Sequence, residues 1–236
     1  SFITQVGQPA NQFYGLTTDG VFTTDAEAAA ANLFRKMADG SLRPFKGGDM
    51  RFNDLNGDGL IDDNDRRVIG NPNPKWFGGI GNRLVWRRFT LDALVTFSAG
   101  NDAYNYVRNR LESVSGVENQ LLSANNRWRG NGHVTNMPKA TRADPMGNAS
   151  FSDRWIEDAS YLRLRTLSIA YQVPMRRQGF IKDMNVYATG NNLLTFTKYL
   201  GYDPEFSARA SVFAMGVDTG LDPIFRSIML GVKLGL

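Results

Sequence analysis

The chain contains no cysteine, and its 236 residues include a single histidine, His133. A disulfide framework, a thiolate metal site and a thiol nucleophile are therefore excluded. His133 lies in a polar stretch without a neighbouring nucleophile or base, which is typical of a solvated loop residue. Glu157 and Asp158 resemble a pair of catalytic carboxylates, but adjacent residues of a strand point to opposite faces. We therefore expect a protein that is not an enzyme.

Long apolar runs and strong charge are also lacking. No run approaches the ~18 apolar residues of a transmembrane helix, and the net charge is only +4. The basic residues occur in scattered pairs such as Arg66-Arg67 and Arg87-Arg88, too short for a nucleic-acid patch. Hydrophobic residues make up 42% of the chain and charged residues 21%, which excludes disorder. No nucleic-acid partner is expected.

Alternation of apolar and polar residues with a period of two is the strongest pattern in the chain. In the last nine residues, five aliphatic side chains share one face of a strand: Ile228, Leu230, Val232, Leu234 and Leu236. The same pattern predicts strands over residues 76–86, 89–99, 161–173, 185–196 and 228–236, with weaker strands over 1–6 and 11–22. A phase slip near Arg165-Thr166 predicts a bulge, or a strand that leaves the membrane there.

Two tryptophans, Trp76 and Trp86, stand at the ends of one predicted strand. Their spacing corresponds to roughly 33 Å of extended chain. A tilted strand of that length would place one tryptophan near each interface of a bilayer core. We therefore expect strands that cross a membrane.

The connections between the predicted strands alternate between long and short. Residues 23–73, 106–159 and 198–222 form long loops, whereas the turns near residues 7–10, 87–88 and 174–183 are short. An up-and-down outer-membrane barrel has this alternation, with the long loops outside the cell. One helix is expected inside the first long loop, over residues 26–37, capped by Thr24 or Asp25 and ended by Gly40.

An acidic segment, residues 54–65, matches a calcium-binding loop. Oxygen donors stand at loop positions 1, 3, 5, 7, 9 and 12: Asp54, Asn56, Asp58, the Leu60 carbonyl, Asp62 and Asp65. Gly59 occupies position 6, where the backbone must turn, and Ile61 at position 8 can pack inward. Calcium needs such a cage of oxygens. A polar turn without a metal is the plainer interpretation, but the number of matching positions favours calcium.

The flanks of this segment exclude an EF-hand. Glycines at 47–48 precede the loop and the run IGNPNP at 69–74 follows it, so helices cannot enclose it. Position 12 is Asp65 rather than the longer Glu, so that water would complete the coordination. The ion is expected to hold an extended loop in place, which is a structural role.

Several blocks along the chain resemble the SusC-like family of TonB-dependent outer-membrane transporters. They include VGQP at 6–9, GDMRFN at 48–53, IGNPNP at 69–74, NRW at 126–128, MPKA at 137–140, SDRWIEDASYLRL at 152–164 and GNNLLTFTKY at 190–199. The blocks cover nearly the whole chain in the family's order. The resemblance implies an all-β fold: the C-terminal strands of a barrel of about 22 antiparallel strands, with long extracellular loops.

The resemblance also implies partners and a location. The remaining barrel and the plug would belong to the same polypeptide, because six or seven strands cannot close the smallest barrel of ~8 strands. The expected function is import of a nutrient, an oligosaccharide or a peptide, across the outer membrane of a Gram-negative bacterium. A SusD-like surface lipoprotein, the TonB complex and outer-membrane lipid are the implied partners.

Ligand contacts are difficult to assign from the sequence. Arg127, Trp128 and Arg129 lie together in a long loop, where Trp128 could stack on a sugar ring, contact the lipoprotein or anchor the loop itself. An alternative to the importer is a soluble, calcium-dependent β-sandwich that binds glycans or mediates adhesion. The apolar outer face of the strand at 228–236 speaks against that alternative, because a solvated exterior would not carry it.

Overall fold

The computed structural model describes residues 1–175, 180–205 and 215–235, which form two compact units. The sheet unit consists of Pro74–Asn101, Asp158–Glu205 and Asp222–Leu236. The loop unit consists of Ser1–Asn73, Asp102–Glu157 and Phe206–Leu221. Segments far apart in the sequence therefore meet in each unit.

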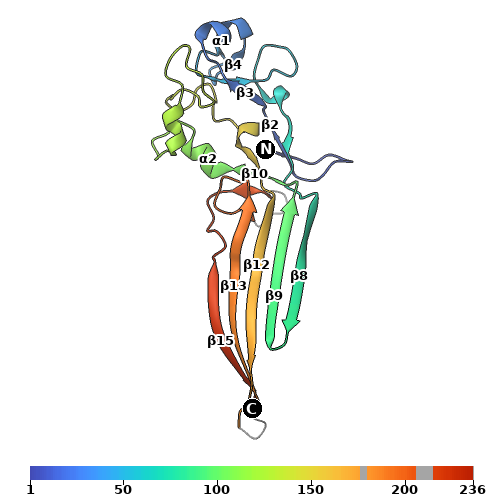
Figure 1. Ribbon diagram of the computed structural model, residues 1–236. Helices are drawn as coiled ribbons and strands as arrows, with labels where there is room; N and C mark the ends of the chain where they lie inside the picture. Colours follow the sequence, from blue (N-terminus) through green and yellow to red (C-terminus); the bar gives the residue numbers. More distant parts are fainter. Residues whose placement is uncertain (176–179, 206–214, 236) are drawn as a thin grey trace. The chain divides into compact units, whose positions relative to one another are not determined.

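Five long antiparallel strands make up the sheet unit, in the spatial order β15-β13-β12-β9-β8 (Figure 1). They are β8 (Trp76–Trp86), β9 (Phe89–Ala99), β12 (Tyr161–Val173), β13 (Asp183–Thr197) and β15 (Ser227–Gly235). The five strands confirm those expected from the alternation, with ends displaced by at most two residues. Leu236 and part of the connection at 174–183 lie outside the described residues.

One face of this sheet is apolar across all five strands. The pairing register places Leu84 of β8 opposite Leu91 of β9, which in turn lies opposite Ile169 of β12. The same line continues to Ala188 of β13 and Leu230 of β15. Because neighbours across a sheet point to the same side, these side chains form one continuous apolar row.

The opposite face is polar. The line next to the apolar row passes through Arg83, Asp92, Ser168, Thr189 and Met229. The hydroxyls of Ser168 and Thr189 lie 2.7 Å apart, and a loose ion pair joins Arg83 to Asp92 at 3.7 Å. The sheet unit thus presents apolar side chains on one side and hydrogen-bonding side chains on the other.

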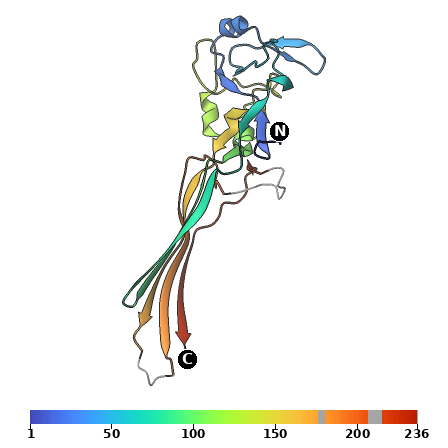
Figure 2. The ribbon, with the colours of Figure 1, turned by 90° about the vertical axis from the view of Figure 1, so that its right-hand side faces the viewer.

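The predicted bulge lies between Leu164 and Thr166, where the register of β12 shifts against both β9 and β13. The shift keeps Leu164 and Leu167 on the same face although they are three residues apart. Figure 2 shows the five strands as a single layer of sheet. A β-sandwich needs two sheets packed face to face, and the described residues of this unit hold one.

Short strands and helices make up the loop unit. Two sheets have three strands each: β1 (Phe2–Ile3), β2 (Gln12–Gly15) and β7 (Arg67–Gly70), and β11 (Ile156–Asp158), β10 (Asp102–Asn105) and β14 (Val217–Asp218). Two sheets have two strands each: β3 (Thr18–Val21) with β6 (Met50–Phe52), and the hairpin of β4 (Phe34–Lys36) with β5 (Leu42–Pro44). The helices are α1 (Asp25–Ala31), α2 (Tyr106–Leu111), η1 (Asp63–Asp65), η2 (Leu122–Asn126) and η3 (Asp153–Trp155).

An apolar cluster holds the loop unit together. Its buried members are Leu16, Val21, Phe22, Ala28, Phe45, Met50, Phe52, Ile61 and Met146, with Leu33 and Trp128 packed against them. Burial of a large apolar side chain contributes about 1.5–3 kcal/mol. The long connections of the sequence are therefore folded structures with their own core.

Three expectations about the loop unit are wrong in detail. The helix expected over residues 26–37 ends at Ala31, because Asn32 adopts the left-handed conformation and Phe34 enters β4. The strand expected over 11–22 is split into β2 and β3, which belong to different sheets. Of the strand expected over 1–6, only Phe2–Ile3 forms.

Thr24 caps α1, as the sequence indicated, by accepting a hydrogen bond from the Glu27 amide. The helices of the described residues are all too short or too polar to pass through a bilayer.

Candidate functional site

The acidic loop at 54–65 is shaped by its own side chains. The Asp54 carboxylate accepts hydrogen bonds from the amides of Gly57 at 2.7 Å and Gly59 at 2.8 Å. Both glycines have positive φ, at 76° and 78°, a conformation that other residues adopt only at a cost. The side-chain carbonyl of Asn56 and the carboxylate of Asp58 each accept a hydrogen bond from the backbone amide two residues further on. These hydrogen bonds orient the side-chain oxygens that would ligate a metal.

The end of the loop is fixed by Asp65, which is completely buried. Its two carboxylate oxygens accept the amides of Leu55 and Asp62, both at 2.9 Å. Asp62 in turn accepts the Asn64 amide at 2.7 Å and caps η1. Asp65 therefore closes the loop by joining its second position to its ninth.

The apolar position of the loop anchors it to the core. Ile61 is buried in the apolar cluster of the loop unit, as its place at loop position 8 indicated. Phe34 donates its amide to the Gly59 carbonyl and accepts the Ile61 amide, both at 2.9 Å. This bridge is the physical reason why the helix α1 stops early: the backbone of Phe34 pairs with the acidic loop instead of continuing the helix.

Whether the acidic loop can bind a cation depends on which oxygen atoms it offers as metal ligands. Among the described residues, no three or more acidic, histidine or cysteine side chains lie together as a group that could hold a metal ion. The segment also offers two uncharged oxygens as metal ligands, the side-chain oxygen of Asn56 and the main-chain carbonyl of Leu60. Calcium binds such oxygens together with carboxylates and water. Asp54, Asn56, Asp58, Leu60, Asp62 and Asp65 fit calcium by donor type and spacing, and the metal stays a prediction.

Trp128 takes the anchoring role that the sequence left open beside ligand binding. Its ring packs against the apolar cluster, and its indole nitrogen donates to the Thr23 carbonyl at 3.0 Å. The neighbouring arginines turn back onto their own loop, Arg127 to the Ala124 carbonyl and Arg129 to the Asn125 carbonyl. Contact of Arg127, Trp128 or Arg129 with a ligand or partner stays a prediction.

The side chains that first suggested catalysis are separated. His133 is exposed. Glu157 forms an ion pair with Arg108 at 2.8 Å, whereas Asp158 accepts the Ser160 amide at 2.9 Å. The two carboxylates therefore have different partners.

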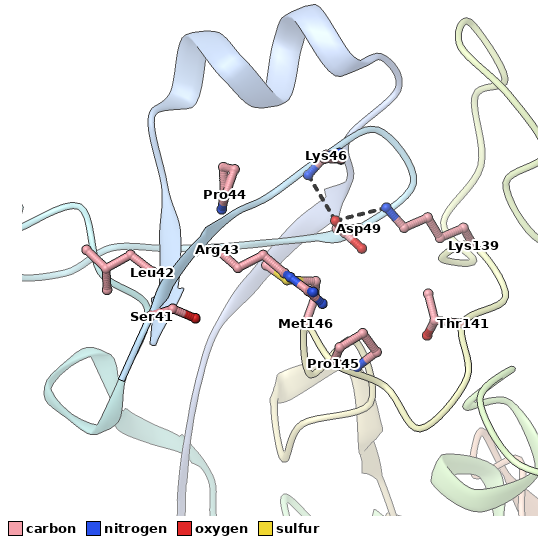
Figure 3. Close-up of a pocket in the computed structure, with 10 residues that line it drawn as sticks. All are labelled: Ser41, Leu42, Arg43, Pro44, Lys46, Asp49, Lys139, Thr141, Pro145 and Met146. Atoms are coloured by element: carbon pink, nitrogen blue, oxygen red, sulfur yellow. Dashed lines mark hydrogen bonds and ion pairs between the residues drawn. The ribbon is translucent and has the colours of Figure 1, made fainter. Parts of the chain in front are cut away.

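A pocket in the loop unit was not expected from the sequence. It has a volume of about 500 Å³ and lies between residues 41–49 and residues 139–146 (Figure 3). Arg43, Lys46 and Lys139 bring positive charge to it, and Asp49 is its acidic residue. Because these cations are scattered along the sequence, no local motif could have revealed them.

Comparison with known proteins places the chain among receptors. No family model matches it. Over 98% of its length it is 30% identical to the TonB-dependent receptor P3 of Formosa agariphila and 23% identical to the TonB-dependent receptor SusC of Bacteroides thetaiotaomicron. It covers 23% and 20% of these two proteins, so the chain spans about a quarter to a fifth of its curated relatives' length.

Among solved structures, the chain is similar to the RagAB peptide importer in its 'closed-closed' state. The TM-score is 0.72 at 23% identity, and the match covers 99% of this chain and 24% of the importer chain. The 'open-open' state gives the same TM-score. This likeness shows the fold. The curated relatives, in agreement with the resemblance of the sequence blocks, show that the chain belongs to the family of TonB-dependent receptors that includes SusC.

Proposed function

We propose that the sheet unit forms part of the wall of an outer-membrane barrel and that the loop unit belongs to its extracellular side. The observation that carries this proposal is the continuous apolar face across all five long strands. Ile228 and Leu230 are each 79% exposed and Trp76 is 75% exposed. Water would disfavour so large an apolar face, whereas the hydrocarbon of a bilayer suits it.

The polar face of the sheet supports the same proposal. Along each strand of a transmembrane barrel, successive side chains face lipid and the barrel interior in turn. The side chains that face the interior are polar. Ser168, Thr189 and Asn191 of this face hydrogen-bond to neighbouring strands or side chains. Trp76 and Trp86, at opposite ends of β8, suit the two interfaces of the bilayer.

The outer edges of the sheet require further strands. β8 and β15 each pair with a single neighbour in the described sheet. An open edge cannot persist in hydrocarbon, because each unpaired backbone group there costs several kcal/mol. We propose that the same polypeptide supplies a plug and the other strands of a barrel that has about 22 strands in total.

For the whole receptor, we propose TonB-dependent import of a nutrient, an oligosaccharide or a peptide, with a SusD-like surface lipoprotein as partner. The names of the relatives support this reading, since they are TonB-dependent receptors and a peptide importer. Energy would come from the TonB complex through a part of the receptor outside this chain.

The test is uptake by cells that lack the receptor gene. We expect loss of uptake for at least one labelled oligosaccharide or peptide, recovery when the gene is restored, and loss again when the membrane potential is collapsed. Uptake that is unchanged by deletion over a broad panel of both nutrient classes would contradict the proposal. A variant with Leu230→Arg, on the apolar face, should fail to recover uptake because it does not assemble.

We also propose that the acidic loop binds one calcium ion that holds the loop unit in shape. The support is the agreement between donor spacing and the hydrogen bonds by which Asp54 and Asp58 hold the turn. Calcium outside the cell reaches concentrations at which weak sites are filled, about 10⁻⁴–10⁻³ M.

A further inference from the structure

We propose that the pocket between residues 41–49 and 139–146 binds the carboxylate of a short peptide that carries an apolar side chain beside it. This inference rests on the proposed importer for the source of the peptide. The pocket volume of about 500 Å³ is within the range of small-molecule sites. Three properties of the pocket support the inference: its charge, its walls and its rigidity.

The single acidic residue of the pocket is already neutralised. Asp49 is 1% exposed, and its carboxylate forms an ion pair with Lys139 at 3.0 Å. It also accepts the Lys46 amide at 2.9 Å (Figure 3) and the Asn148 side-chain amide at 3.2 Å. A buried carboxylate with two amide donors and a cation repels an incoming anion weakly.

Two cations are left for a ligand. Arg43 and Lys46 line the pocket, and neither side chain has an ion pair within the part of the chain that the structure describes. Figure 3 shows the Arg43 side chain reaching across the pocket toward Met146. A guanidinium can hold a carboxylate with two parallel hydrogen bonds, and the lysine adds a second positive charge. The local field therefore favours a carboxylate.

Asp39, an acidic neighbour of Arg43, does not cancel this charge. Asp39 lies in the turn between β4 and β5 and is exposed to solvent. Its carboxylate accepts the Ser41 hydroxyl at 2.6 Å and the Ser41 amide at 2.9 Å. These bonds are the main reason that the pKa of Asp39 is lowered, and the charge of Arg43 contributes less. Water screens such an exposed pair strongly.

The walls favour a peptide over a sugar. Leu42, Pro44, Pro145 and Met146 supply apolar surface to the pocket. No aromatic side chain is among its described lining residues, and a flat aromatic ring is the usual platform for a pyranose. The combination suits a carboxylate next to a hydrophobic group, as in an acidic or C-terminal peptide residue.

The pocket is held open before a ligand arrives. Lys139 joins the two walls: its amide donates to the Gly48 carbonyl at 2.8 Å and its ammonium to the Gly47 carbonyl at 3.1 Å. The Met50 amide donates to the Asn148 side chain at 2.8 Å. A preorganised site loses little conformational entropy on binding, which raises its affinity.

The test is equilibrium binding to the detergent-purified full-length receptor, which requires no import. Calorimetry would compare the dipeptide acetyl-Leu-Glu with its neutral analogue acetyl-Leu-Gln-amide, and with galacturonate and inorganic phosphate. The double variant Arg43→Gln/Lys46→Gln should bind acetyl-Leu-Glu at least about tenfold more weakly. The matched control is Lys36→Gln, on the same hairpin but outside the pocket lining, and it should bind as the unmodified receptor does.

Two results would overturn the inference. Equal affinity of the double variant and the unmodified receptor would show that the pocket is not the site. Equal or tighter binding of galacturonate or phosphate would show that the pocket recognises an anion without a peptide. If binding is lost as expected while deletion of the gene leaves uptake unchanged, the proposed import is wrong and the site is retained.

Discussion

The guanidinium of Arg163 lies 2.5 Å from the carboxylate of Asp203 in the sheet unit, and the Arg163 side chain is 2% exposed. Asp203 also accepts the amides of Glu205 at 2.9 Å and Ile224 at 3.1 Å. A second carboxylate, that of Glu205, lies 3.1 Å from Arg163. One buried arginine on the polar face of β12 therefore fixes the segments on both sides of the last long connection.

The ion pair predicts an asymmetric response to substitution. Asp203→Ala leaves the buried guanidinium with less compensation and should lower the free energy of unfolding by about 3–5 kcal/mol. The double variant Arg163→Met/Asp203→Leu should recover most of that loss, because no charge remains buried. Denaturant unfolding of the purified receptor measures both. Equal losses in the single and double variants would show that the pair contributes through packing alone.

Much of the sheet unit could be predicted from the sequence, because its strands repeat with a period of two and the bulge at Leu164–Thr166 appears as a phase slip. The end of α1 could not be predicted from local propensity. Its stopping point is set by Phe34, whose backbone bonds to Gly59 and Ile61 lie well along the chain. Tertiary pairing there outweighs the helix preference of residues 32–37.

Of the candidate sites, some could be predicted from the sequence and others could not. The acidic loop was visible because its donors are contiguous in sequence. The basic pocket was not, because Arg43 and Lys139 are brought together only by the folding of two distant segments. Arg163 and Asp203 likewise carry no local signal of their pairing. Trp128 was visible as a candidate, and the structure shows what it packs against.

We expect calcium binding by the acidic loop to depend on the carboxylates of Asp54 and Asp58. Asp54→Ala and Asp58→Ala should each reduce bound calcium by about one ion per receptor, since both supply oxygens at ligand positions. Asp63→Ala is the matched control, because Asp63 stands at loop position 10 and is exposed beside Arg66. Equilibrium dialysis with metal analysis gives the stoichiometry. Retention of calcium by the Asp54 variant would contradict the assignment.

We expect replacement of Trp128 to loosen the core of the loop unit. Trp128→Ala removes ring packing and the bond to the Thr23 carbonyl, so the loop unit should be destabilised by about 2–4 kcal/mol. Hydrogen exchange of the amides at residues 45–52 should accelerate, because these residues pack beside the ring. Arg129→Ala should leave their exchange unchanged, since Arg129 is exposed. Unaltered exchange in the Trp128 variant would show that the indole is not an anchor.

The central claim is that one face of the sheet meets lipid and the other meets water. Adjacent residues of β12 test it most directly: Ile169 on the apolar face and Ser168 on the polar face. Single cysteines at these positions, in a cysteine-free receptor reconstituted in bilayers, would carry spin labels for collision measurements. We expect oxygen to reach the label at Ile169→Cys and a water-soluble nickel chelate to reach the label at Ser168→Cys. Equal access of the nickel chelate at both positions would contradict it.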